Sequence, residues 1–257
     1  MSVRRRGAYT EETQIRLMQI LTHLPKHQPL MQSSKQIKSK ERVSEHGEVF
    51  TADREVNAML DLVKQETERI DSRFLEPACG NGNFLVKILE RKLRVIWETN
   101  TNLYGRNADH EKIDCELAQA VSSIYGIDIM PDNVEECRVR LLETITDWYS
   151  HAHLGGRLDG ELLTTLQFLL RRNILWGDAL TLCTPDDRKD PIIFSEWGFI
   201  GQTVKRRDFT LDMLLRPRSF EGENLFSDLG DEVFIPEPCA EYKPIHYLKL
   251  HTQDAAQ

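Results

Sequence analysis

The fold class of this chain is decided by the stretch Phe74-Leu75-Glu76-Pro77-Ala78-Cys79-Gly80-Asn81-Gly82-Asn83-Phe84-Leu85. It predicts a short strand that ends at Glu76, because Pro77 breaks the extended pattern. Two glycines follow and let a ligand touch the backbone, and a helix that begins near Asn83 offers unpaired N–H groups. A strand, a glycine turn and a helix in this order bind a nucleotide-like ligand at the carboxyl edge of a sheet. A plain tight turn without a ligand is the alternative.

Strands and helices alternate along the chain on both sides of this stretch. Apolar spacing predicts helices over residues 53–70, 83–98, 111–123, 131–149 and 158–171, with Thr51 or Asp53 as the N-cap of the first. Strands are predicted over residues 73–76, 124–129, 173–176 and 192–194. This alternation is typical of an α/β fold with a parallel sheet and helices on both faces. Beyond residue 198 only short strands around 232–235 and 245–250 are expected.

The charge distribution divides the chain into two regions. Residues 1–45 hold nine Lys or Arg and four Asp or Glu, a balance of +5, so the net charge of −8 leaves −13 for residues 46–257. The first region combines a helix over residues 11–24 with a polar linker and predicts a basic helical arm without a core of its own. The second region carries all the alternating elements and is expected to form one α/β domain.

The composition argues against several classes of protein. No run of about 18 apolar residues is present, so neither a membrane span nor a membrane partner is expected. The basic segment Met1–Tyr9 is not followed by an apolar stretch, which argues against a secretory signal. The five cysteines lie far apart without a CxxC pair, so no metal site or disulfide framework is expected and a cytoplasmic location is favoured.

Duplex DNA binding by this chain alone is not expected. A protein that grips duplex DNA offers a broad basic face to the phosphates. Here only the arm and one short patch are basic, and the patch consists of Lys205, Arg206, Arg207, Arg216 and Arg218.

The twelve-residue stretch resembles the cofactor motif of amino-group DNA methyltransferases, the D/E-P-A-C-G-S/T-G-x-F-L form, with Asn81 in place of the usual Ser or Thr. The resemblance covers roughly residues 46–200. It is greatest to the adenine-specific methylase subunits of restriction–modification systems in which the cofactor half precedes the catalytic half. It implies a Rossmann-like S-adenosyl-L-methionine-dependent methyltransferase core with an N-terminal helical arm.

Three further segments fit this resemblance. Phe50 and Thr51 resemble the segment that covers the methionine end of the cofactor, although an aromatic residue before a helix also serves as a hydrophobic staple. Asp128 at a strand end can accept both ribose hydroxyls, with an exposed strand-end Asp as the alternative. Asp178 can accept the adenine amine, with a Gly-Asp turn as the alternative. The resemblance implies a cofactor site formed by Phe50, Thr51, Glu76, Pro77, Ala78, Gly80, Gly82, Asn83, Phe84, Asp128, Ile129, Asp178 and Ala179.

The spacing from the glycine turn to the strand-end carboxylate is unusual. Asp128 lies 46 residues beyond Gly82, whereas the usual interval in dinucleotide-binding folds is about 20. An inserted loop and an extra helix over residues 99–123 are therefore expected.

The catalytic half of the family pattern is missing. Those methyltransferases place an Asp/Asn-Pro-Pro-Tyr/Phe tetrapeptide after the fourth strand, where it holds the amino group of a flipped base. This chain has no such tetrapeptide and carries Ile192-Ile193-Phe194-Ser195-Glu196-Trp197 at the expected position. Ser195 or Glu196 can accept a hydrogen bond and Trp197 can stack, so these three are the candidate catalytic residues. An ordinary strand end with a core tryptophan is the alternative.

Three functions follow from these patterns. The first is an adenine-type DNA methyltransferase that reaches its DNA through a partner specificity or restriction subunit, because only about 60 residues follow Trp197 and a region that reads base edges needs more. The second is a non-catalytic subunit of a restriction or defence complex that binds S-adenosylmethionine. The third is a methyltransferase with an acceptor other than DNA. The sequence leaves open whether the chain is catalytically active.

Overall fold

The computed structural model describes residues 38–40, 42, 44, 51–104, 109–151, 158, 160–215 and 236–256. All of them belong to one unit that spans residues 37–257. The expected helix over residues 11–24, nearly all of the expected arm and the expected strand around 232–235 therefore lie outside the described residues.

A three-stranded parallel sheet lies at the centre of this unit. Its strands are β1 (Phe74–Glu76), β2 (Ile124–Asp128) and β3 (Ile174–Trp176), in the spatial order β1-β2-β3. Leu75 pairs with Tyr125, and Ile127 pairs with Leu175. β2 is buried along its whole length, as its apolar sequence predicts for the middle strand of a covered parallel sheet. The α/β class and the parallel sheet are thereby confirmed.

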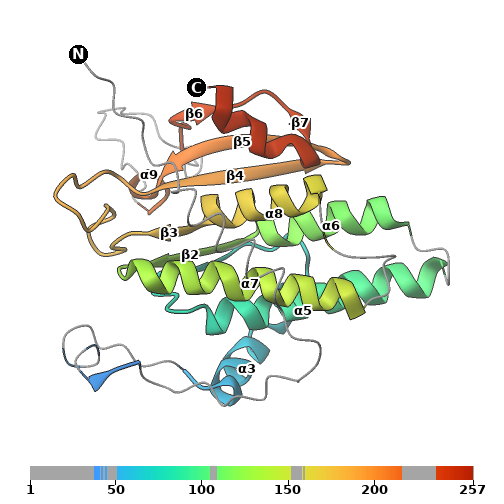
Figure 1. Cartoon of the computed structure of the whole chain (residues 1–257), viewed down its shortest axis with the longest axis horizontal. Coiled ribbons are helices and arrows are strands. Elements are labelled where there is room, and N and C mark those ends of the chain that lie inside the picture. The colour runs from blue at the N-terminus through green and yellow to red at the C-terminus, as the bar shows by residue number, and fades with distance from the viewer. Residues whose placement is uncertain are drawn as a thin grey trace, which may run out of the picture. The chain divides into compact units, whose positions relative to one another are not determined.

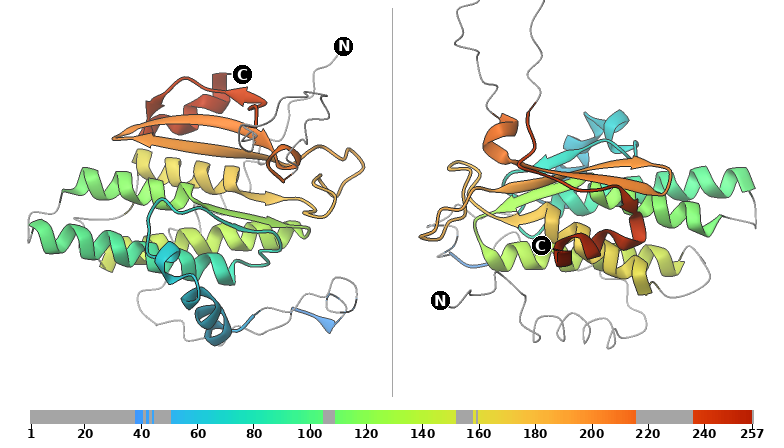
Figure 2. Two further views of the ribbon diagram at one scale, coloured as in Figure 1. Left: turned by 180° about the vertical axis from the view of Figure 1, so that it is seen from behind. Right: turned by 90° about the horizontal axis from the view of Figure 1, so that it is seen from above.

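Four long helices connect these strands. α5 (Asn83–Tyr104) and α7 (Pro131–His151) begin beyond the ends of β1 and β2, whereas α6 (His110–Ser122) and α8 (Gly160–Asn173) lead into β2 and β3. α5 and α7 pack on one side of the sheet, and α6 and α8 lie toward the other side (Figures 1 and 2). α5 continues beyond its predicted end at residue 98, so the expected insertion over 99–123 consists largely of the end of α5 and of α6.

The core between these layers is aliphatic. Its fully buried side chains include Leu85 and Leu89 on α5, Leu117 on α6, Ile127 on β2 and Leu141 on α7. Burial of a side chain of this size contributes about 1.5–3 kcal/mol. The apolar positions that predict the helices are therefore the positions that hold the layers together.

The segment before β1 differs from the prediction of one helix over residues 53–70. It forms α3 (Asp53–Asp61) and the single turn α4 (Lys64–Thr67), and the N-cap is Ala52 rather than Thr51 or Asp53. The backbone leaves the helical region at Val63. After α4, the carbonyls of Arg69, Ile70 and Ser72 all turn toward the buried ammonium of Lys92 on α5. The helix predicted to continue to Ile70 therefore ends before the segment whose carbonyl groups accept hydrogen bonds from this ammonium.

The largest departure from the prediction is the strand after β3. Instead of ending at Phe194, β4 runs from Ile193 to Ile200 and pairs antiparallel with β5 (Thr203–Thr210) in a second sheet. Gly201, at φ +57°, begins the two-residue turn between them and adopts the positive φ that such hairpins require. β4 is therefore not a fourth parallel strand.

The remaining described elements complete this second sheet. α9 (Leu211–Leu215) follows β5, and β6 (Ala240–Glu241) and β7 (Ile245–His246) both pair with β5. The 3₁₀ segment Tyr247–Ala256 follows β7 and packs on α8. Of the strand expected over 245–250, only Ile245–His246 is extended.

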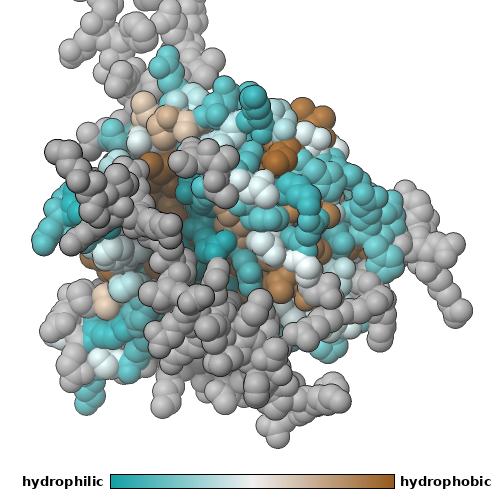
Figure 3. Space-filling model, turned by 45° about the horizontal axis from the view of Figure 1, so that its top comes forward, coloured by the Kyte–Doolittle hydropathy of each residue, from teal (hydrophilic) through white to brown (hydrophobic). Residues whose placement is uncertain are grey.

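The hairpin of β4 and β5 packs on the side of the parallel sheet opposite α5 and α7 (Figure 1). Tyr125 makes the contact, because its hydroxyl donates to the carbonyl of Ser195 at 2.9 Å. Its ring also meets the ring of Phe194 edge to face, with centroids 5.4 Å apart. Seen from the hairpin side, hydrophobic atoms are exposed in separate groups among hydrophilic ones (Figure 3). None of the helices in the described ranges has the length and apolar character needed to cross a membrane.

Candidate functional site

A cavity of about 590 Å³ opens at the carboxyl ends of the parallel strands. A volume of this size suits a small-molecule ligand. Four segments line it: the segment before α3, the glycine turn after β1, the end of β2 with the start of α7, and the loop after β3. The lining residues are Thr51, Glu76, Pro77, Ala78, Cys79, Gly80, Asn83, Phe84, Asp128, Ile129, Met130, Asn133, Gly177, Asp178, Ala179 and Leu180.

Most of the residues predicted for a cofactor site meet in this cavity. Eleven of the thirteen line it: Thr51, Glu76, Pro77, Ala78, Gly80, Asn83, Phe84, Asp128, Ile129, Asp178 and Ala179. The two exceptions are Phe50, which lies outside the described residues, and Gly82. Thr51 reaches the cavity because its carbonyl accepts a hydrogen bond from the Asn83 amide at 3.0 Å. Segments more than 100 residues apart in the sequence therefore surround one space.

The two glycines of the turn have different roles. Gly80 adopts φ +52° and lines the cavity. Gly82 adopts φ +89° and faces α7, where an added Cβ would lie 2.6 Å from the Cys137 sulfur. Both positions favour glycine because other residues rarely adopt positive φ. Gly82 brings the start of α5 close to α7 and does not line the cavity.

Asp128 joins the glycine turn to the start of α7. Its carboxylate accepts hydrogen bonds from the backbone N–H groups of Gly80 and Met130, both at 2.8 Å, and from the Asn133 amide at 3.2 Å. The residue is 8% exposed, so these donors satisfy a nearly buried charge. An ionised carboxylate has about four acceptor positions. Donors among the described residues use three of them, which leaves one on Oδ2 for a ligand.

Two further carboxylates line the cavity. Glu76 is partly buried, and this burial raises its pKa, although the Ala78 N–H opposes the effect by donating to it. The pKa of Asp178 is lowered by the backbone N–H of Leu180 and the hydroxyl of Thr181, which donate at 2.9 and 3.0 Å. Asp178 therefore also forms the turn that was the alternative interpretation of the Gly-Asp pair.

The charged side chains among the described lining residues are all acidic. Glu76, Asp128 and Asp178 are acidic, and none of the lining residues in the described part of the chain is Lys, Arg or His. The other walls are apolar or backbone, from residues such as Pro77, Phe84 and Met130. Such a cavity favours ligands that donate hydrogen bonds or carry positive charge. It disfavours phosphates, which would meet carboxylates without compensating cations.

Five lining residues are not among the thirteen predicted for the cofactor site: Cys79, Met130, Asn133, Gly177 and Leu180. Four of them are direct chain neighbours of predicted residues, so their positions follow once the strand ends are known. Asn133 is different, because it lies one helical turn beyond the strand end and is 1% exposed. Its only sequence signal is an amide in the first turn of a helix that follows the strand-end Asp128.

The three candidate catalytic residues do not line this cavity. Ser195, Glu196 and Trp197 lie within β4, and Ser195 and Glu196 line a second cavity of about 400 Å³ that shares no lining residue with the first. Glu196 is paired with Arg73 at 2.9 Å and also with Arg207. The expected strand end at these three residues is wrong, because β4 continues to Ile200 as half of a hairpin.

Buried contacts explain why Ser195 and Trp197 occupy their positions in β4. The Ser195 hydroxyl donates to Asp208 at 2.7 Å, and Asp208 also receives two hydrogen bonds from the fully buried Arg206 at 2.8 Å. The Trp197 indole donates to Asn173 at 2.9 Å, and its ring lies 5.6 Å from the Arg206 guanidinium. These contacts match the alternative interpretation, a strand with a core tryptophan.

No known protein family, curated protein or solved structure matches the chain. The geometry of the cavity and the character of its lining are therefore the grounds on which a function is inferred.

Proposed function

We propose that the chain binds S-adenosylmethionine in the cavity at the carboxyl ends of β1, β2 and β3, on a core of the Rossmann-like methyltransferase type. One observation carries the proposal. The motif residues line a single cavity that presents three carboxylates and, among the described residues, no cation. The three carboxylates and the lack of a cationic side chain among the described lining residues favour a ligand without phosphates over dinucleotides and nucleoside triphosphates. S-adenosylmethionine has hydroxyl and amino donors and a sulfonium charge, and it carries no phosphate.

Each carboxylate of the cavity has a use in this proposal. The free acceptor position on Asp128 would bind a ribose hydroxyl, and Asp178 would accept the adenine amine. Glu76 lies beside the glycine turn, where a carboxylate stabilises an ammonium or a sulfonium charge. Pro77, Phe84, Met130 and Leu180 would cover the apolar faces of the ligand. When bound, the cofactor supplies an electrophilic methyl group on sulfur.

The reaction that follows is an amino-group methyl transfer of the adenine DNA methylase type, carried out with a partner. The sequence lacks the family tetrapeptide, and Ser195, Glu196 and Trp197 lie away from the cavity. The acceptor-binding group would therefore come from a partner subunit of a restriction or defence system, and that subunit would also read the DNA.

A second candidate function rests on the same placement. If Ser195, Glu196 and Trp197 only stabilise the hairpin, the chain can serve as a non-catalytic subunit that senses S-adenosylmethionine. The two candidates differ in one measurement, the transfer of a labelled methyl group to mixed DNA, RNA and protein acceptors in the presence of the native partner. Transfer supports the methyltransferase, and cofactor binding without transfer supports the sensor.

The cofactor proposal itself is tested by calorimetry with S-adenosylhomocysteine. Micromolar or tighter binding is expected, with no binding of NADH or ATP at the same concentrations. Asp61→Ala serves as the control for Asp128→Ala, because Asp61 is an exposed carboxylate on α3 that pairs with Arg91. The proposal fails if the wild-type chain does not bind S-adenosylhomocysteine at millimolar ligand, or if the phosphate-bearing nucleotides bind as well.

A further inference from the structure

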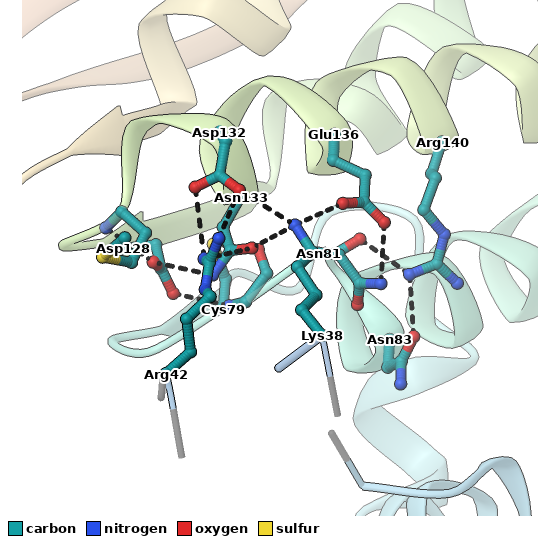
Figure 4. Close-up of polar contacts among 12 residues, drawn as sticks. Lys38, Arg42, Cys79, Asn81, Asn83, Asp128, Asp132, Asn133, Glu136 and Arg140 are labelled. Atoms are coloured by element: carbon teal, nitrogen blue, oxygen red, sulfur yellow. Dashed lines mark hydrogen bonds and ion pairs between the residues drawn. The ribbon is translucent and has the colours of Figure 1, made fainter. Parts of the chain in front are cut away.

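Asn133 lines the cavity and also contacts Lys38 and Arg42, two residues of a cationic segment that precedes it in the sequence. Its side-chain nitrogen donates to Asp128 at 3.2 Å. Its side-chain oxygen accepts from Lys38 at 2.7 Å and from Arg42 at 3.3 Å (Figure 4). Rotation of the amide by 180° would place its NH₂ group against two cations and its oxygen against a carboxylate. Lys38 and Arg42 therefore favour the orientation in which Asn133 holds Asp128.

The two cations are themselves held by acidic residues on the first turns of α7. Arg42 pairs with Asp132 at 2.6 Å, and Lys38 pairs with Glu136 at 2.6 Å. Carboxylates at the start of a helix are favoured by the helix dipole, so this end of α7 suits the arrangement. Lys38 and Arg42 are joined to Asn133 and to its helix at the same time.

The same face of α7 also holds the glycine turn. Glu136 accepts a hydrogen bond from the Asn81 amide at 2.9 Å. One turn further along, Arg140 donates to the carbonyl of Asn81 and to the amide oxygen of Asn83, both at 2.7 Å (Figure 4). Residues four apart on a helix lie on one face, so a single row of side chains contacts both Lys38 and the turn. The cationic segment and the glycine turn of the cavity wall are therefore both held by side chains of α7.

We propose that Asn133 is a positioning residue of the ligand cavity and that Lys38 and Arg42 act through it, so that ligand affinity depends on this cationic segment. The inference rests on the proposed function, because the ligand in question is S-adenosylmethionine. Asn133 directs its N–H to Oδ1 of Asp128, and among the described residues the Gly80 N–H is the donor to Oδ2. Without the cations Asn133 loses two hydrogen-bond partners that favour this orientation, and its own hydrogen bond to Asp128 is weakened. The Asp128 carboxylate is then held toward the ligand by fewer contacts.

The test is a thermodynamic cycle in the full-length chain, with S-adenosylhomocysteine as the probe and calorimetry as the measurement. Lys38→Ala combined with Arg42→Ala removes two partly buried cations that contact Asn133 and should weaken binding by about threefold to tenfold, within the range of coupling between residues in contact. Asn133→Ala should weaken it at least as much. In the Asn133→Ala background, the loss of both cations should change the affinity by less than about twofold, because coupled residues are not additive.

The salt dependence of binding supplies a readout that a purely structural role would not change. Between about 50 and about 500 mM NaCl, wild-type affinity should fall as the ion pairs are screened, and the Lys38→Ala/Arg42→Ala variant should lose this dependence. The matched control is Lys64→Ala combined with Arg69→Ala. It removes two exposed cations that pair with Glu68, Glu66 and Asp71, and it should bind like the wild type.

The outcomes separate the two proposals. If the wild type binds and the Lys38→Ala/Arg42→Ala variant binds equally well at every salt concentration, the positioning role is overturned and the cofactor proposal stands. Additive losses in the cycle overturn it as well, because the cations would then act without Asn133. If the wild type does not bind at millimolar ligand, the proposed function fails and this inference fails with it.

Discussion

The carboxylate of Asp128 accepts a hydrogen bond from the backbone N–H of Gly80 at 2.8 Å, across 48 residues of sequence. This contact connects the turn after β1 to the end of β2 at the carboxyl edge of the parallel sheet. It also places the carboxylate at the end of β2 beside Gly80, which adopts φ +52°. The ligand cavity and the stability of the fold therefore depend on the same side chain.

Asp128→Ala should lower both stability and affinity. The substitution leaves the N–H groups of Gly80 and Met130 and the Asn133 amide without their acceptor, and an unsatisfied buried donor costs about 1–3 kcal/mol. Urea unfolding should show a loss of at least this size, and calorimetry should show weaker binding of S-adenosylhomocysteine by about 1–3 kcal/mol. Asp128→Asn keeps one oxygen and should lose less on both measures. Equal affinity in Asp128→Ala and wild type would contradict the assignment of this carboxylate to the ligand.

Gly82→Ala should destabilise the fold through two separable effects. The first is backbone strain at φ +89°, and the second is a Cβ placed 2.6 Å from the Cys137 sulfur. The control is Gly160→Ala, which has φ +59° but no atom within 4 Å of the added Cβ. Each positive-φ substitution costs about 1–3 kcal/mol, and thermal unfolding should show a larger loss for Gly82. Cys137→Ala in the Gly82→Ala background should recover part of the difference. Equal losses at both glycines would show that the contact with α7 is not tight.

The parallel part of the fold could be predicted because local signals agree there with tertiary packing. The stretch from Phe74 to Leu85 contains its own strand, turn and helix start, and β2 is apolar at almost every position. The carboxyl ends of parallel strands meet at one edge, so Glu76, Asp128 and Asp178 were expected to converge. They do line one cavity.

The hairpin could not be predicted because the burial and contacts of its side chains depend on partners elsewhere in the fold. Lys205, Arg206 and Arg207 suggest a surface patch in the sequence, yet Arg206 is fully buried between Asp208 and Asp254. Ser195 and Trp197 likewise receive their roles from Asp208 and Asn173. Asn133 was missed for a similar reason, since its partners lie 5, 91 and 95 residues away.

Substitutions in the hairpin network should change stability without changing ligand affinity. Asp208→Ala removes the main partner of the buried Arg206, and breaking a buried pair in this way costs about 3–5 kcal/mol. Ser195→Ala should cost about 1 kcal/mol through the lost hydrogen bond to Asp208 and the longer one from Arg172. Binding of S-adenosylhomocysteine by the folded Ser195→Ala variant should match the wild type, as should any methyl transfer with the native partner. The control Glu241→Ala breaks an exposed pair with Lys205 and should cost less than about 1 kcal/mol. Loss of transfer in Ser195→Ala at normal affinity would return this residue to the catalytic site.

The ion pairs on α7 should be visible in the titration of Asp132. Hydrogen bonds from Arg42 and then Lys38 hold the pKa of this carboxyl at about 2, below its ordinary value of 3.8. Because the folded pKa is the lower one, the stabilisation is present above pH 3.8 and is lost as the pH falls through 2. The energy is modest, because the Asp132 side chain is 50% exposed and solvent screens the pair.

Carboxyl ¹³C NMR of the labelled protein at about pH 3, between the two pKa values, checks this directly. In the wild type Asp132 should stay ionised, whereas in Arg42→Ala its pKa should rise toward 3.8 and the group should become largely protonated. Lys38→Ala should produce a smaller rise, because Lys38 makes the longer contact with Asp132, at 3.3 Å against 2.6 Å for Arg42. If Asp132 titrates at its ordinary value in the wild type, Arg42 does not occupy this position in solution. The orientation of Asn133 would then have to be set without Arg42, by contacts that include those with Asp128 and Lys38.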